Sequence, residues 1–177
     1  RLLGAKGIKE DMRLLVDIFK KIKDTWTWGE GFAIEAMDLL AQRYGYPHYL
    51  IEVLGQRLLK TTIGSVIEAA AELLANSKEN KAVEYLLNAA KRGEEGKGYI
   101  INALGRIPSE EAMRALVELY ALEARLEDPF TIESYERAII GQGEEIIPHL
   151  LARIVSYERT KLMMMAMRVK INNMSAS

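Results

Sequence analysis

The sequence contains no cysteine, only four prolines and no strong excess of either charge. The absence of cysteine excludes a disulfide scaffold, thiol catalysis and thiolate metal sites. The longest strictly apolar run covers residues 162–167, which is too short to span a bilayer. With 24 Lys and Arg against 25 Asp and Glu, the net charge of -1 predicts no general attraction to nucleic acid or to an anionic membrane. The sequence does not open with a charged-then-apolar signal segment, so we expect a cytoplasmic location.

The apolar residues that are present follow a helical period. The 177 residues are 49% hydrophobic and 28% charged, which is typical of a globular chain rather than a disordered one. Apolar side chains recur at spacings of three and four, and no segment alternates with the period of a strand. We therefore predict an all-α chain that forms a single domain over residues 1–177. The predicted helical segments are 9–23, 31–43, 47–59, 62–76, 80–91, 98–106, 109–124, 131–141, 144–157 and 160–172.

The chain also repeats itself. When it is shifted by 101 residues, segment 3–17 aligns with segment 104–118 and seven of fifteen residues are identical. The same shift places Pro47 on Pro148. Such a period indicates a stack of about four and a half similar units that bury a continuous core together. The equivalent positions are predicted to be Arg13, Pro47, Glu84, Arg114 and Pro148.

Each unit is predicted to contain a helix A, a tight turn and a helix B. Small residues end several A helices, as in Leu104-Gly105, and we expect them to let the two helices of one pair approach closely. Acidic residues open several B helices, where they complement the positive end of the helix dipole. Ser109 precedes Glu110 and Glu111 and is predicted to be the N-cap of its helix.

The residues 103–116, with Ala-Leu-Gly-Arg-Ile followed by Glu-Ala-Met-Arg-Ala-Leu, resemble the HEAT-like repeats. The resemblance is in particular to the short form found in phycobilisome-lyase-type proteins, whose second helix is similar to residues 145–151. The resemblance implies a right-handed α-solenoid of antiparallel helix pairs that serves protein–protein contact and carries no catalytic residue. Because the first unit is cut and the last helix lacks its partner, we expect an interior or truncated segment of a longer array.

The sequence offers no constellation for chemistry. Its two histidines, His48 and His149, lie three units apart, about 30 Å at a helix spacing of about 10 Å, and so cannot share a metal. The glycine-rich residues 93–98 lack both the spacing and the hydroxyl residue of a phosphate loop. We therefore expect no catalytic residue, no metal and no cofactor, and a protein that is not an enzyme.

We instead expect a scaffold or assembly subunit that binds a polypeptide on the concave face lined by successive B helices. Charges of both signs occur there, which favours a partner that carries mixed charges. The candidate partner-binding residues on these helices are Arg13, Asp17, Glu84, Asn88, Arg114, Glu118, His149 and Arg153.

Aromatic residues form a second candidate surface. Trp26 and Trp28 lie in one connection between units, and Tyr44, Tyr46 and Tyr49 follow one unit later. Tryptophan and tyrosine are enriched in binding hot spots. The alternative is that these rings cover the end of the core.

The segment 162–167 is apolar almost all round and rich in methionine. A helix of this kind needs cover on both sides. We expect a second copy, in a two-fold contact through Met164 and Met167, or the rest of the native protein to provide that cover.

Two other functions remain open at this point. A nucleic-acid-binding protein would need a basic stripe on the concave face, where the candidate residues mix Arg with acids. An accessory subunit of a lyase-type enzyme is suggested by the resemblance alone. It would need a partner subunit to complete an active site.

Overall fold

The computed structural model describes residues 8–22, 27–93, 96–123, 129–152 and 159–176, and the all-α prediction is confirmed for them, with no β-strand in these ranges. Each predicted helical segment overlaps one of the observed helices, with differences at the ends. Their bounds are α2 Asp11–Lys21, α3 Thr27–Tyr44, α4 His48–Leu58, α5 Gly64–Ser77, α6 Asn80–Arg92, α7 Lys97–Gly105, α8 Glu110–Glu123, α9 Pro129–Gly141, the 3₁₀ turn η1 Gly143–Ile146, α10 Ile147–Ala152 and α11 Arg159–Ala176.

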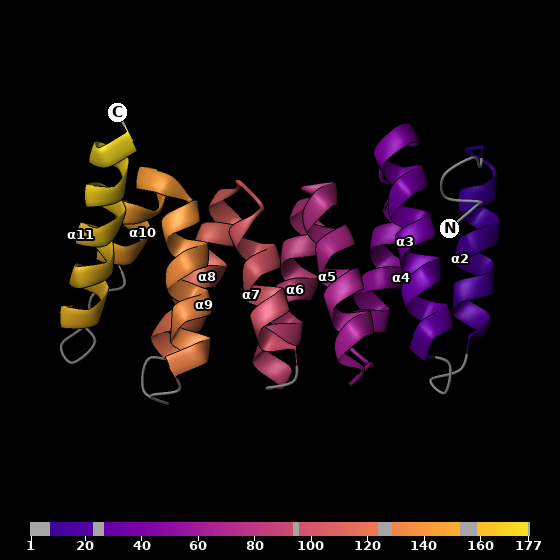
Figure 1. Ribbon diagram of the computed structural model, residues 1–177, viewed down its shortest axis with the longest axis horizontal. Coiled ribbons are helices and arrows are strands. Elements are labelled where there is room, and N and C mark those ends of the chain that lie inside the picture. The colour runs from indigo at the N-terminus through magenta and orange to yellow at the C-terminus, as the bar shows by residue number, and fades with distance from the viewer. Residues whose placement is uncertain (1–7, 23–26, 94–95, 124–128, 153–158, 177) are drawn as a thin grey trace.

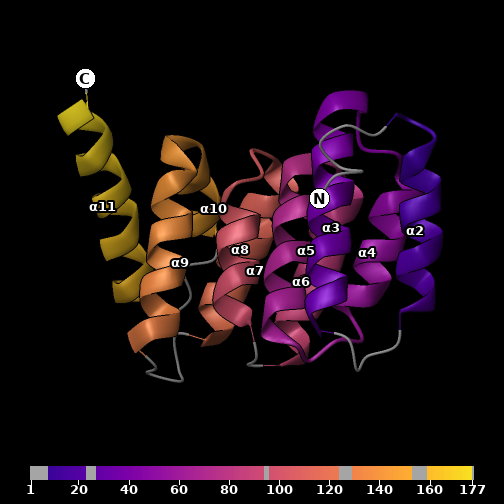
Figure 2. The same ribbon diagram turned by 45° about the vertical axis from the view of Figure 1, so that its right-hand side comes forward.

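The helices form a row that is two layers deep (Figure 1). One layer, called the A layer, contains α3, α5, α7, α9 and α11, each packed against the next. The other, called the B layer, contains α2, α4, α6, α8 and α10 in the same order. Each B-layer helix also packs against the A-layer helix that follows it in the chain. The turned view in Figure 2 shows the same succession along the row.

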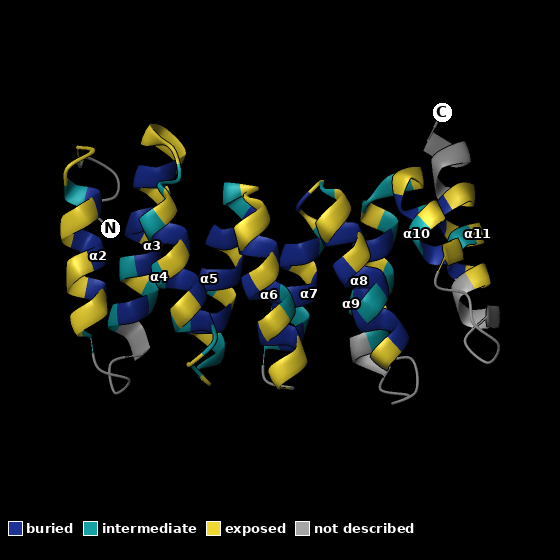
Figure 3. Cartoon of the chain, turned by 180° about the vertical axis from the view of Figure 1, so that it is seen from behind, coloured by how far each residue is buried: buried dark blue, intermediate teal, exposed yellow. Residues whose placement is uncertain are grey.

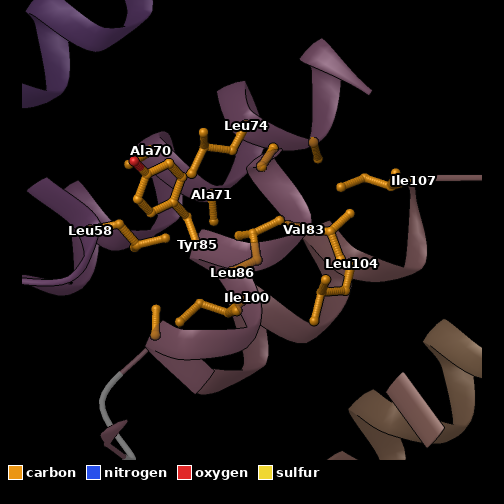
Figure 4. Packing of buried hydrophobic residues seen from close by; sticks show 14 of the residues in the cluster. Leu58, Ala70, Ala71, Leu74, Val83, Tyr85, Leu86, Ile100, Leu104 and Ile107 are labelled. Carbon is orange, nitrogen blue, oxygen red and sulfur yellow. The ribbon is translucent and has the colours of Figure 1, made fainter. Parts of the chain in front are cut away.

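The hydrophobic core runs between the two layers along the whole row. Buried positions line the facing sides of the helices, and exposed positions lie on the outer sides (Figure 3). Figure 4 shows part of this core, to which Leu58 of α4, Leu74 of α5, Leu86 of α6 and Leu104 of α7 contribute. Every helix adds apolar residues to one cluster, so no helix pair has a core of its own.

A row of polar side chains ties the carboxyl ends of the A-layer helices together. Asn76 Nδ2 donates to Asp38 Oδ1 at 3.3 Å, and Arg106 Nη2 donates to Asn76 Oδ1 at 2.8 Å. Further along, Gln142 Nε2 donates to the carbonyl of Gly105 at 2.9 Å. Because these bonds join residues 30 to 38 positions apart, they fix the spacing of successive helices.

Ser109 caps α8, as its position in the sequence predicts, because its Oγ accepts a hydrogen bond from the Ala112 N–H at 3.2 Å. Gly105 ends α7 and lies against the next A-layer helix. A Cβ at Gly105 would lie 2.7 Å from the Cβ of Ala138 in α9. The missing side chain therefore lets α7 approach the next A-layer helix closely, and the predicted close approach to its own B-layer partner α8 stays a prediction.

The burial pattern gives the register between the helices. Shifting α2 by 101 residues places the buried Met12, Leu15, Val16 and Phe19 on buried residues of α8. In α10 the buried Leu150 corresponds to Leu50 at a shift of 100 residues, so the match of Pro47 with Pro148 is one residue out. The residue in α4 that corresponds to Arg13 is His48, because Pro47 is the N-cap that precedes the helix.

Candidate functional site

The partner-binding residues predicted on the B helices lie on the B layer wherever the structure describes them. Arg13, Asp17, Glu84, Asn88 and Arg114 are exposed. Glu118 and His149 are half-buried, on α8 and α10 respectively. The structure spreads these residues along the layer and does not gather them into one cluster.

Several of these charges on α6 and α8 already have partners within the chain. Lys81 Nζ lies 2.6 Å from Glu84 Oε2, and Arg114 Nη2 donates to Glu110 Oε1 at 2.6 Å. Lys91 Nζ of α6 lies 2.6 Å from Glu118 Oε1 of α8, which joins the two helices. The middle of the B layer therefore presents charges that neutralise one another at short range.

Two of the predicted residues, Trp26 and Arg153, lie outside the described residues. Trp28 belongs to the first turn of α3, not to the connection before it, although its side chain is outside the description. The helix starts earlier than predicted, at Thr27, and ends at Tyr44. The aromatic surface expected around both tryptophans is thus described only through the later tyrosines.

Those tyrosines line the first of two hollows at the seam between α2 and α4. This tyrosine hollow has a volume of about 620 Å³ and lies where the turn before α4 meets the start of α2. The Arg13 guanidinium lies 5.9 Å from the centre of the Tyr49 ring, which is within range of a cation–π contact. The residues that line the hollow are Lys9, Glu10, Met12, Arg13, Tyr44, Gly45, Tyr46, Pro47 and Tyr49.

Tyr46 of the tyrosine hollow is anchored by a side-chain hydrogen bond. Its hydroxyl donates to Asp38 Oδ1 at 3.1 Å. Burial raises the pKa of the Tyr46 phenol well above its ordinary value, and the neighbouring Asp38 carboxylate raises it further. The neutral hydroxyl is therefore a fixed donor over the whole physiological pH range.

The second hollow lies at the other end of the same seam, where α2 ends. This cationic hollow has a volume of about 480 Å³. Its floor is apolar and its rim carries more positive than negative side chains. The residues that line it are Phe19, Lys20, Ile22, Glu52, Val53, Gln56, Arg57, Lys60 and Tyr85.

The floor of the cationic hollow depends on a glycine inside α4. A Cβ at Gly55 would lie 2.2 Å from the ring of Tyr85, so only glycine lets this ring lie flat on the helix. Figure 4 shows the Tyr85 ring beside Leu58, among the side chains that join α4 to α6. A glycine inside an apolar helical segment is the one signal of this contact in the sequence, and sequence reasoning missed it.

A buried ion pair fixes the rim. Glu30, in the first turn of α3, is buried, and both of its carboxylate oxygens accept hydrogen bonds from Arg57 of α4. The Arg57 Nε–Glu30 Oε2 distance is 3.3 Å. A buried carboxylate needs such a partner because its desolvation is costly. Nothing in the sequence pairs these two residues, which are 27 positions apart.

Three lysines that line the two hollows lack such partners among the described residues. Lys9, Lys20 and Lys60 form no ion pair with any residue that the structure describes. This contrasts with the paired Lys81 and Lys91 of α6. The seam between α2 and α4 therefore has an attraction for anionic groups that the middle of the layer lacks.

The methionine segment behaves differently on its two sides. Met165 and Val169 of α11 are buried against the core. Met164 and Met167, the predicted self-association residues, are both exposed, and Met164 also lines a small hollow beside α9. The exposed apolar surface expected on this helix is therefore present.

None of the helices in the described ranges is both long enough and apolar enough to cross a membrane. Over the same ranges, no three His, Cys, Asp or Glu side chains are grouped so that they could hold a metal ion. No family model, no curated protein and no solved structure matches this chain.

Proposed function

We propose that the chain is a non-catalytic protein-interaction module that binds a polypeptide along its B layer. In this proposal the two-layer row is a right-handed α-solenoid of HEAT-like helix pairs in a cytoplasmic scaffold or assembly subunit. Such arrays use the extended surface of one layer as a binding face.

One observation carries the proposal: the seam between α2 and α4 combines two hollows of several hundred cubic ångströms with exposed aromatic and charged side chains. Tyrosine and arginine, both present at the tyrosine hollow, are enriched at interface hot spots. The hollows lie on the same layer as the exposed polar residues Arg13 and Asp17, so one ligand can contact both. A long polypeptide segment suits such a surface better than a compact small molecule, because the features extend along a helix.

The proposal is tested by selecting binders from a displayed random-peptide library against the folded chain. The selected peptides are then titrated by calorimetry against two variants of unchanged net charge. The B-layer variant exchanges the charges of α2 through Arg13→Asp and Asp17→Arg. The A-layer control exchanges an exposed ion pair of α9 through Glu133→Arg and Arg137→Glu.

We expect the B-layer variant to weaken binding by about tenfold and the control to leave it unchanged. Failure to select any peptide, or peptides that respond only to the A-layer exchange, would contradict the proposal. Filter binding of duplex DNA at physiological salt should give no measurable retention, because the net charge of -1 releases few counterions. Sub-micromolar retention would instead favour a nucleic-acid-binding protein.

A further inference from the structure

The cationic hollow has the floor of a pocket for an apolar side chain. Phe19 and Tyr85 are buried, and Ile22 and Val53 are half-buried, so their remaining exposed carbon faces the hollow. Its volume of about 480 Å³ lies in the range of ordinary ligand clefts and exceeds that of one aromatic side chain. The close contact between Gly55 and Tyr85 holds this floor in place without a bound partner.

The rim of the hollow selects for negative charge. Lys20, Arg57 and Lys60 stand against a single acid, Glu52. Arg57 is already bonded to Glu30, so Lys20 and Lys60 are the two cations that a ligand can pair with. Both are exposed, and their long stems can follow a ligand placed over the apolar floor.

The same features argue against a nucleic acid as the occupant. A phosphate backbone needs a continuous basic stripe, whereas two of the three basic residues of α6, Lys81 and Lys91, are paired with carboxylates. An apolar floor with a charged rim matches the usual anatomy of a protein hot spot, in which an apolar anchor is surrounded by polar contacts.

We propose that the cationic hollow receives one large apolar side chain of a partner segment whose neighbouring residues are acidic and pair with Lys20 and Lys60. This inference rests on the proposed polypeptide-binding function and names the chemistry of its partner. The partner is a short acidic stretch with a single phenylalanine, tryptophan or leucine as its anchor.

The test uses fluorescence anisotropy with a short labelled peptide in which one phenylalanine lies among aspartates and glutamates. Two companion peptides replace the phenylalanine with alanine, or the acidic residues with lysines. We expect the acidic peptide to bind more weakly as salt increases. Removal of the phenylalanine should weaken binding by about tenfold or more, and the lysine-flanked peptide should not bind.

A charge exchange on the protein sharpens the result. The variant Lys20→Glu with Lys60→Glu should lose the acidic peptide by about tenfold or more and gain the lysine-flanked one. The matched control is Lys21→Glu with Lys78→Glu, which changes the net charge equally at exposed lysines outside the hollow. The control should bind both peptides as the wild type does, and far-ultraviolet circular dichroism verifies that each variant keeps its helix content.

Each other outcome overturns the inference. Equal loss in both variants would mean a response to net charge alone, and tighter retention of a single-stranded DNA probe would make the site a nucleic-acid site. No binding of the acidic peptide would exclude this partner chemistry. If the display selection yields binders that tolerate the Lys20 and Lys60 changes and respond to the α2 charge exchange, the proposed function stands and this hollow is not its site.

Discussion

The B layer is loosely packed between α2 and α4 and tightly packed in its middle. Leu14 of α2, Tyr85 of α6 and Ala115 of α8 hold the same helix position, yet their exposed fractions are 52%, 9% and 2%. One turn later, Ile18 of α2 is 44% exposed while Leu119 of α8 is 1% exposed. The same position is thus surface at one end of the row and core in the middle, because burial depends on whether another helix packs on that side.

The corresponding residues of α4, Tyr49 and Val53, are half-buried and line the two hollows. The side chains at the contact explain this intermediate state. Arg13 lies over Tyr49 between α2 and α4, whereas Gly55 lets α6 come close to α4. The distance between two helices follows the size of the residues at their contact. The large Arg13 and Tyr49 side chains therefore keep α2 away from α4, whereas Gly55 allows a close contact between α4 and α6.

The largest expected effect on stability comes from breaking the ion pair of Arg57 with Glu30 beside the cationic hollow. Arg57→Met leaves the buried Glu30 carboxylate without its partner and should lower the free energy of unfolding by about 3–5 kcal/mol. The control is Arg114→Met, which removes an exposed pair with Glu110 and should cost less than about 1 kcal/mol. Urea unfolding followed by circular dichroism measures both. Equal losses of unfolding free energy would show that the pair of Arg57 with Glu30 is no more buried than the pair of Arg114 with Glu110.

The second prediction compares the stability contributed by one helix position in α2, where it is exposed, and in α8, where it is buried. Leu119→Ala should cost about 2–5 kcal/mol because the side chain is enclosed between packed helices. Ile18→Ala, at the corresponding position of α2, should cost less than about 1 kcal/mol because it is already in contact with water. A loss at Ile18 as large as that at Leu119 would mean that α2 has cover on its outer side.

The third prediction tests whether the close contact between α4 and α6 requires a glycine at position 55. Gly55→Ala places a methyl group in the Tyr85 ring and should destabilise the fold by about 1–3 kcal/mol, despite the better helix propensity of alanine. Gly31→Ala in α3 meets nothing within 4 Å and should instead stabilise by about 0.5–1 kcal/mol. Thermal unfolding of the two variants should therefore shift in opposite directions, and a stabilised Gly55→Ala would refute the close contact.

The fourth prediction concerns pH and the tyrosine hollow. At pH 8, Tyr46→Phe should lose about 1 kcal/mol with the hydrogen bond to Asp38. Burial and Asp38 raise the folded-state pKa of Tyr46, so the stability from its neutral phenol is complete below the unfolded pKa of about 10 and is lost above it. Between pH 8 and pH 11 the wild type should therefore lose more stability than Tyr46→Phe does. An identical pH response in the two chains would contradict the buried hydrogen bond between Tyr46 and Asp38.

The smallest effect on folding is expected at the other end of the row. Met164→Lys with Met167→Lys changes two exposed residues of α11 and should alter the unfolding free energy by less than about 0.5 kcal/mol. The variant should nevertheless sediment as a smaller species than the wild type if this helix mediates self-association. Leu122→Lys, at an exposed position of α8, serves as the control. A wild type that remains monomeric at high concentration would exclude association through α11.

The sequence by itself was sufficient for the helices and for much of the register. Spacings of three and four placed the helical segments, and the match of Arg13 with Arg114 paired α2 with α8 because both helices bury the same side. Ser109 was recognisable as a cap because capping depends only on residues three positions away. The same local reasoning misplaced Pro47 by one residue, since a match of four residues by identity cannot distinguish a helix N-cap from the second position of a helix.

The candidate site was largely out of reach of the sequence. Arg13 was identified by its position in the repeat and the tyrosines by residue type, whereas Lys20, Lys60 and the pair of Arg57 with Glu30 were not identified. The reason is that a hollow is defined by the distance between two helices, and that distance depends on which side chains face each other across the seam. Periodicity determines which side of each helix is apolar. Only the packing of α2, α4 and α6 decided how far each apolar side chain is buried. Tyr85 became part of the core, Val53 lines the cationic hollow and Leu14 stays in contact with water.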